Sequence, residues 1–117
     1  MLSEREIHYL AMNLVGKELE KEGFEFLSVN SKLKKNPQFV CLREKKLHFV
    51  LVRAILHPND PNDYDVVFMQ TMKEHAEKFE AKMYYAGVGL VNANDKTRPL
   101  VNGEPYIIDY NGLKEIV

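Results

Sequence analysis

The stretch from Leu47 to Leu56, LHFVLVRAIL, constrains the fold of this chain more than any other. A strand with one face in water alternates apolar and polar residues, whereas this stretch is apolar on both faces in its middle. We therefore predict a central strand that is covered on both sides. Arg53 interrupts the apolar run, and the burial of an unpaired charge is costly.

The rest of the chain predicts two helices and four further strands around this one. Helices are expected at residues 4–22, where Ser3 and Glu6 match a capping box and Gly23 a helix stop, and at residues 64–81. Strands are expected at residues 24–29, 38–43, 82–91 and 106–110, followed by a C-terminal tail. A three-strand meander followed by one crossover helix gives the order α-β-β-β-α-β-β. This order predicts an α/β (α+β) fold with a mixed central sheet and flanking helices.

Length and charge narrow the class of protein. A chain of 117 residues is expected to form a single domain over residues 1–117. Its 16 basic and 17 acidic residues give a net charge of -1, less positive than is usual for a nucleic-acid or membrane-surface protein. The N-terminus begins a charged amphipathic helix rather than a signal peptide, and no apolar run could span a bilayer. We therefore expect a cytoplasmic protein without a membrane partner.

The sequence predicts no metal site, cofactor or catalytic residue. Cys41 is the only cysteine, which excludes a disulfide within the chain and any zinc or iron–sulfur site with several cysteine ligands. The four histidines are scattered without metal-ligand spacing. Cys41 lies among apolar residues and is expected to be buried and inert. Gly87 and Gly89, inside a predicted strand, are expected to mark a bulge or a close backbone approach.

Basic residues offer two candidate contacts for an anion or a nucleic acid. Six of them lie near two predicted turns of one sheet region: Lys32, Lys34, Lys35, Arg43, Lys45 and Lys46. They could face phosphates, or they could form a solvated loop and hairpin tip. Arg53 could form a structural ion pair with Asp63, Asp65 or Glu74, or it could line an anion-binding pocket.

The order of elements resembles the core of the restriction-endonuclease-like PD-(D/E)XK fold. The N-terminal half is also similar to a small bacterial nuclease-like family, through the segments GKELEKEGF (residues 16–24), VNSKLKKNPQFVC (29–41) and LHFVLVR (47–53). The resemblance implies a metal-binding Asp at Phe39, a Glu at Leu51 and a Lys at Arg53. Phe and Leu cannot ligate Mg²⁺, and Arg stays protonated and cannot act as a base. The expectation is a nuclease-like fold without catalytic residues.

The whole chain is also similar to a family of short bacterial proteins, mainly from the Bacteroidetes, often labelled as a subunit of the sodium-translocating NADH-quinone reductase. The shared stretches include KLKKNPQFVC (residues 32–41) and YAGVGL (85–90). The ferredoxin-like subunit of that enzyme needs four cysteine ligands and a flavin domain. One cysteine and 117 residues supply neither, so the resemblance implies membership of the family rather than the labelled redox activity.

The function that these patterns favour is a non-catalytic binding or interaction module, with an unknown protein partner or self-association. The alternative is a nucleic-acid-binding protein that uses the basic turns and Arg53. An enzyme with an unrecognised site is the third hypothesis. Nucleic-acid binding predicts strong salt dependence, an interaction module an exposed apolar patch or an oligomer, and an enzyme a pocket with converging titratable groups.

Overall fold

The computed structural model describes residues 1–33 and 35–117. Two helices, α1 (Glu4–Lys21) and α2 (Val66–Glu77), accompany a sheet over these residues. Its strands are β1 (Glu25–Val29), β2 (Phe39–Arg43), β3 (Lys46–Leu56), β4 (Lys82–Asn92), β5 (Tyr106–Tyr110) and β6 (Lys114–Glu115). The predicted α/β class with a mixed sheet is confirmed. None of the described helices is long and apolar enough to cross a membrane.

The strands are arranged in the order β1-β2-β3-β4-β5, and β6 pairs with β4. Neighbouring strands are antiparallel except β3 and β4, which are parallel because α2 carries the chain back across the sheet between them. β6 is a correction to the predicted strandless tail. Lys114 and Glu115 pair with Tyr85 and Tyr84 along the part of β4 that β5 leaves free.

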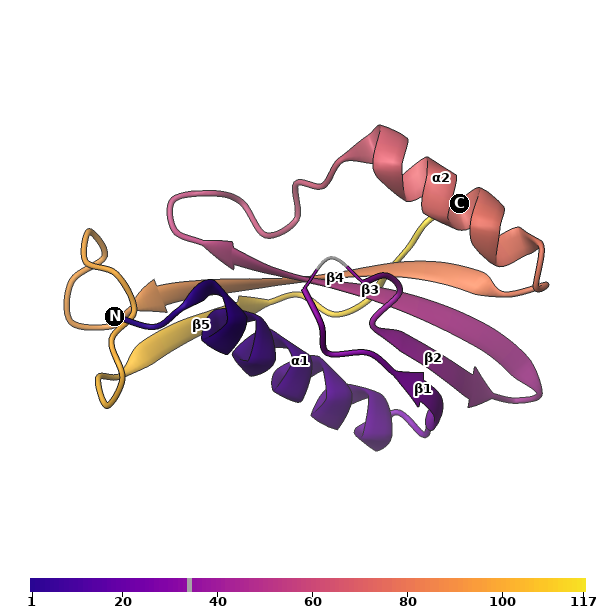
Figure 1. The fold of residues 1–117 in the computed structure, drawn as a ribbon, viewed down its shortest axis with the longest axis horizontal. Helices are drawn as coiled ribbons and strands as arrows, with labels where there is room; N and C mark the ends of the chain where they lie inside the picture. The colour runs from indigo at the N-terminus through magenta and orange to yellow at the C-terminus, as the bar shows by residue number, and fades with distance from the viewer. Residues whose placement is uncertain (34) are drawn as a thin grey trace.

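The two helices lie on opposite faces of the sheet (Figure 1). Val50 and Val52 of β3 belong to the apolar cluster beneath α1, and Phe49 and Leu51 belong to the cluster beneath α2. All four side chains are at most 6% exposed. The prediction that β3 is a central strand covered on both sides is therefore confirmed.

The ends of α1 follow from its sequence, and the ends of α2 do so only in part. Ser3 and Glu6 form the predicted capping box, and α1 stops at a left-handed Gly23 with φ of 84°. Helix α2 is shorter than the predicted 64–81. The Asp65 carboxylate accepts from the amide of Phe68 and caps the helix, and Glu80, with φ of 56°, turns the chain away after Glu77.

A loop takes the place of α2 over the second half of β4. Pro61 is buried there, and its carbonyl accepts a 3.0 Å hydrogen bond from the Tyr85 hydroxyl. A Cβ atom on Gly87 would lie 2.0 Å from the Pro61 carbonyl oxygen, and one on Gly89 would lie 3.1 Å from Pro61 Cγ. The predicted close backbone approach at these two glycines is confirmed.

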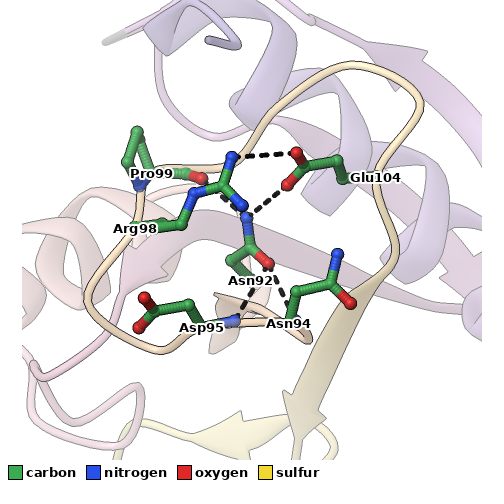
Figure 2. A network of polar contacts seen from close by, with 6 residues as sticks. All are labelled: Asn92, Asn94, Asp95, Arg98, Pro99 and Glu104. Atoms are coloured by element: carbon green, nitrogen blue, oxygen red, sulfur yellow. Dashed lines mark hydrogen bonds and ion pairs between the residues drawn. The ribbon is translucent and has the colours of Figure 1, made fainter.

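The long loop between β4 and β5 is organised by one buried amide, Asn92 (Figure 2). Asn92 is 1% exposed, and its Nδ2 donates to the carbonyl of Pro99 at 3.0 Å and to Glu104 Oε2 at 2.9 Å. Its Oδ1 accepts from the backbone amides of Asn94 and Asp95. Because the full hydrogen-bonding capacity of the amide is used, the loop has a fixed shape.

This loop also positions the start of the chain. Leu100 is buried in the cluster beneath α1, and its carbonyl accepts from the amide of Leu2 at 2.8 Å. The N-terminus therefore lies beside the β4–β5 loop (Figure 1). Leu2 lines the cavity described next.

Candidate functional site

The candidate site lies at the part of β3 that extends beyond β2. β2 pairs with β3 from Lys46 to Val50 and no further. The amide of Gln38 donates to the carbonyl of Val50 at 3.1 Å, and its side-chain Oε1 accepts from the amide of Val52 at 2.7 Å. Through these two bonds the buried Gln38 occupies the edge of β3 as far as Val52.

Arg53 lies at this end of the occupied edge. Its Nη1 donates to Asn36 Oδ1 and to the carbonyl of Val52, both at 3.0 Å, and its Cζ lies 5.8 Å from the centre of the Phe68 ring. Asn36 Oδ1 also accepts from Gln38 Nε2 at 2.8 Å. Burial lowers the pKa of Arg53 from its ordinary value, but a guanidinium stays protonated.

The predicted ion pair of Arg53 is wrong. Among the described residues, Asp63, Asp65 and Glu74 are not ion-paired with it. Neutral acceptors, the Asn36 amide and a backbone carbonyl, hold the guanidinium instead. Arg53 is thus a partly buried cation without a salt-bridge partner in the described structure.

Arg53 lines a cavity of about 870 Å³ between the N-terminal ends of the two helices. Its walls come from α1, α2, the edge of β3 and the β1–β2 connection: Leu2, Glu4, Ile7, His8, Leu33, Asn36, Arg53, Ala54, Leu56, Asp65 and Phe68. Segments far apart in the sequence therefore meet at this end of the sheet. The volume lies within the usual range for small-molecule sites.

His8 is the second notable polar group of this wall. It is 5% exposed, and its Nε2 has no hydrogen-bond partner among the described residues. Desolvation lowers the pKa of His8, and the nearby charge of Arg53 lowers it further. A buried imidazole nitrogen without a partner is uncommon in a folded protein.

The wall also carries two carboxylates, Glu4 and Asp65. Asp65 already accepts from the amide of Phe68 as the N-cap of α2. The remaining lining is mostly apolar, including Leu2, Ile7 and Phe68. The cavity therefore offers a guanidinium for one negative charge and apolar walls for the body of a ligand, and its two carboxylates disfavour a highly charged anion.

The structure does not bring the predicted basic residues together. Lys32 and Lys35 lie in the connection before β2, and Lys45 and Lys46 lie at the hairpin after it. In an antiparallel meander consecutive turns fall at opposite ends of the shared strand. The basic residues that were predicted to lie in one region therefore form two separate groups, one at each end of β2. Lys34 lies outside the described residues.

Arg43 contacts other parts of the protein and contributes to the fold. Its Nη1 donates to the carbonyl of Glu22 at 3.2 Å, and its Cζ lies 4.0 Å from the centre of the Phe24 ring. It therefore links the end of β2 to the end of α1. Its guanidinium is held by the protein itself, away from the Arg53 cavity.

The three positions implied by the nuclease resemblance do not share one face of the sheet. Phe39 packs beneath α1, Leu51 packs beneath α2, and Arg53 follows Leu51 by two residues. Phe39 pairs with Val50, so it points to the opposite face from Leu51. Phe39 and Leu51 therefore lie on opposite faces of the sheet.

Cys41 is fully buried, as predicted, and burial raises the pKa of its thiol to about 11. A thiol of this kind is unreactive near neutral pH. Across residues 1–33 and 35–117, no group of three or more His, Cys, Asp or Glu side chains could hold a metal ion.

Three residues of the site escaped the sequence interpretation: His8, Asn36 and Gln38. His8 had a detectable signal, because it lies three and seven residues before Ala11 and Val15 on the buried stripe of α1. Asn36 and Gln38 had none, since their bonds to Arg53 and Val52 depend on how the β1–β2 connection folds over β3.

Comparison with known proteins gives a family but no activity. No curated protein matches the chain, and no solved structure matches it. Residues 5–116 match the family model described as Domain of unknown function (DUF8840). Because this match covers nearly the whole chain, the protein belongs to the DUF8840 family.

Proposed function

We propose that this protein is a non-catalytic binding module that holds an anionic ligand in the Arg53 cavity. The observation that carries the proposal is Arg53 itself. It is a partly buried cation, it has no salt-bridge partner among the described residues, and it lines a cavity of about 870 Å³. A bound anion would pair directly with the guanidinium, and hydrogen bonds between charged groups are among the stronger ones in proteins.

Two further features support the proposal. The guanidinium is already oriented by Asn36 and by the carbonyl of Val52, so little side-chain freedom would be lost on binding. His8 lines the same cavity, so its ring could lie against a bound ligand, while its Nε2 is itself buried from the cavity. The absence of catalysis is proposed because the aligned positions Phe39 and Leu51 carry no metal-ligating oxygen.

The proposal includes a nuclease-like ancestry for the fold. The meander β1-β2-β3, the crossover helix α2 and the parallel pair of β3 and β4 support it. The opposite facing of Phe39 and Leu51 argues that any such relationship is distant. The nucleic-acid alternative has weaker support, because the basic turns lie at opposite ends of β2 and Arg43 is held by Glu22.

The test is a titration of isotope-labelled protein with acetate, citrate and inorganic phosphate, followed by the NMR signal of the Arg53 side chain. We expect saturable shifts at Arg53 and at the backbone of Asn36. Arg53→Gln removes the first signal and should abolish the shifts at Asn36. Arg5→Gln, which removes the same charge from an exposed position of α1, should not.

Absence of saturable shifts for all three anions would contradict the proposal. A short DNA duplex in the same assay tests the alternative. Binding that falls steeply with salt and maps to the β2–β3 hairpin would favour the nucleic-acid function instead.

A further inference from the structure

The edge of β3 next to Arg53 carries open backbone groups, beginning at Ala54. The carbonyl of Val50 and the amide of Val52 bond to Gln38, and the carbonyl of Leu56 bonds to the amide of Asn59, all on the side away from β4. The amide of His57, by contrast, donates to Leu90 of β4. Backbone groups of a strand alternate in direction, so the N–H and C=O of Ala54 also point away from β4.

No group of the described structure pairs with this N–H and C=O of Ala54. The residue lines the Arg53 cavity on one side. A second hollow of about 450 Å³ continues along the same edge at Ala54, Ile55 and Leu56, with Asn59, Asp60 and Asp63 on its wall. The amide of Leu56 points the same way and also has no partner in the described structure, so the open edge runs from Ala54 to Leu56, with space at both of its ends.

Arg53 lies at the end of this open edge that is next to Gln38. Its guanidinium bonds to the carbonyl of Val52, on the same side as β2 and Gln38. An added strand that continues the line and direction of β2 would run antiparallel to β3. It would lie opposite Ala54 with its C-terminal end against Arg53, Asn36 and Gln38.

We propose that the Arg53 cavity takes the C-terminal residue of an extended peptide, whose backbone pairs with Ala54 and whose terminal carboxylate binds Arg53. This inference rests on the proposed function and names its ligand class. Addition of a strand to a free sheet edge and capture of a terminal carboxylate are both established modes of peptide recognition.

The charges of the cavity favour this ligand over a phosphate. Glu4 and Asp65 line the same cavity, so a dianion would face two carboxylates with one guanidinium to balance it. A peptide terminus carries a single negative charge on an otherwise neutral backbone. Its last side chain would meet Leu2, Ile7 or Phe68, which favours an apolar residue.

The test uses a fluorescein-labelled pentapeptide of alternating threonine and valine, ending in valine, with binding followed by fluorescence anisotropy. The peptide with a free C-terminus should bind about tenfold more tightly than the same peptide with a C-terminal amide. Arg53→Gln should erase that difference. Ala54→Pro should weaken both peptides, because it removes the open N–H while leaving the bonds to β4 intact.

The outcomes separate this inference from the proposed function. Equal binding of acid and amide, or binding that Ala54→Pro leaves unchanged, overturns the inference. If acetate shifts the Arg53 signal but the peptide binds no more tightly than acetate, the inference fails and the anion site stands. If neither acetate, phosphate nor peptide shifts that signal, both fail. Arg53→Lys, which keeps the charge, should retain part of the preference for the free acid.

Discussion

At the scale of single residues, Gly87 carries the sharpest steric constraint. A Cβ atom there would lie 2.0 Å from the Pro61 carbonyl oxygen and 2.7 Å from the Tyr85 ring. Because a backbone oxygen cannot move as cheaply as a side-chain tip, Gly87→Ala should lower the free energy of unfolding by about 3 kcal/mol or more. Urea denaturation followed by circular dichroism measures this change.

Gly89→Ala is the matched control, since the same atom is added to the same strand. The nearest atoms to a Cβ at Gly89 are Asp109 Cβ and Pro61 Cγ, both at 3.1 Å. We expect a smaller loss, of about 1 kcal/mol. Equal losses for the two variants would show that the contact between Pro61 and β4 is not what requires Gly87.

His48 predicts a pH dependence of stability. It is 3% exposed, lies between the rings of Phe24 and Tyr84, and neither ring nitrogen has a partner in the described structure. Burial lowers its pKa below the ordinary value of about 6.5. The unfolded chain therefore binds a proton more readily than the folded one, and stability should be lost as the pH falls below about 6.5.

His48→Phe should weaken this dependence, and the part that remains should come from His8, whose pKa burial also lowers. At pH 7 the variant should be as stable as the parent or more so, because an apolar ring replaces a buried group whose nitrogens have no described partner. The measurement is urea denaturation from pH 5 to pH 8. The exposed His57→Gln variant should keep the parent's profile, and an unchanged profile for His48→Phe would contradict the prediction.

At the scale of elements, one glycine inside α1 and one just after its end have opposite requirements. Gly16 lies inside the helix, with Phe39 Cζ 3.5 Å from a hypothetical Cβ atom, whereas Gly23 ends the helix at φ of 84°. Gly16→Ala should stabilise the protein by about 0.5–1 kcal/mol, and Gly23→Ala should destabilise it by about 1 kcal/mol. Thermal unfolding of both variants tests the pair, and a shift of the same sign would contradict it.

The elements also show which parts of the fold were predictable. The limits of α1 come from local bonds: Ser3 and Glu6 at its start, and the amides of Gly23 and Phe24 at its end. The end of α2 could not be predicted, because a non-glycine residue, Glu80, adopts positive φ there. β6 was missed because two residues pair with β4 only through tertiary contact.

The β4–β5 loop depends on Asn92. Asn92→Asp would keep the two backbone donors to its oxygen but would lose the bonds to Pro99 and Glu104 and place a carboxylate against Glu104. We expect a loss of about 3 kcal/mol. Asn94→Asp adds the same charge to an exposed side chain of the same loop and should change stability little, as urea denaturation would show.

At the scale of the whole molecule, the site was less predictable than the fold. The periodicity of LHFVLVRAIL identified the covered central strand, because burial on both faces is visible in one segment. The surroundings of Arg53 involve His8, Asn36 and Phe68, which come from three other segments. From the sequence one could infer that Arg53 needs a partner or a pocket. Only the folded chain shows that it bonds to the neutral amide of Asn36 and lines a cavity.

The two apolar clusters lie on opposite faces of one sheet and contact different helices. It can therefore be tested whether they unfold together. Leu51 and Val52 are adjacent, at most 1% exposed, and face α2 and α1 respectively. Because both clusters are built on β3 and β4, Leu51→Ala and Val52→Ala should each lower the stability of the entire domain, by between about 2 and 4 kcal/mol.

Amide hydrogen exchange under native conditions measures the response of each layer. In a single cooperative domain, either substitution should reduce protection in α1 and α2 by the same free energy, since the most protected amides exchange through global unfolding. Urea transitions followed by circular dichroism should remain single and steep. If Leu51→Ala reduced protection only in α2, the α2 layer would be an independent unit and residues 1–117 would not fold as one domain. The adjacent pair serves as its own control, because the two changes differ mainly in the face of the sheet that loses contact.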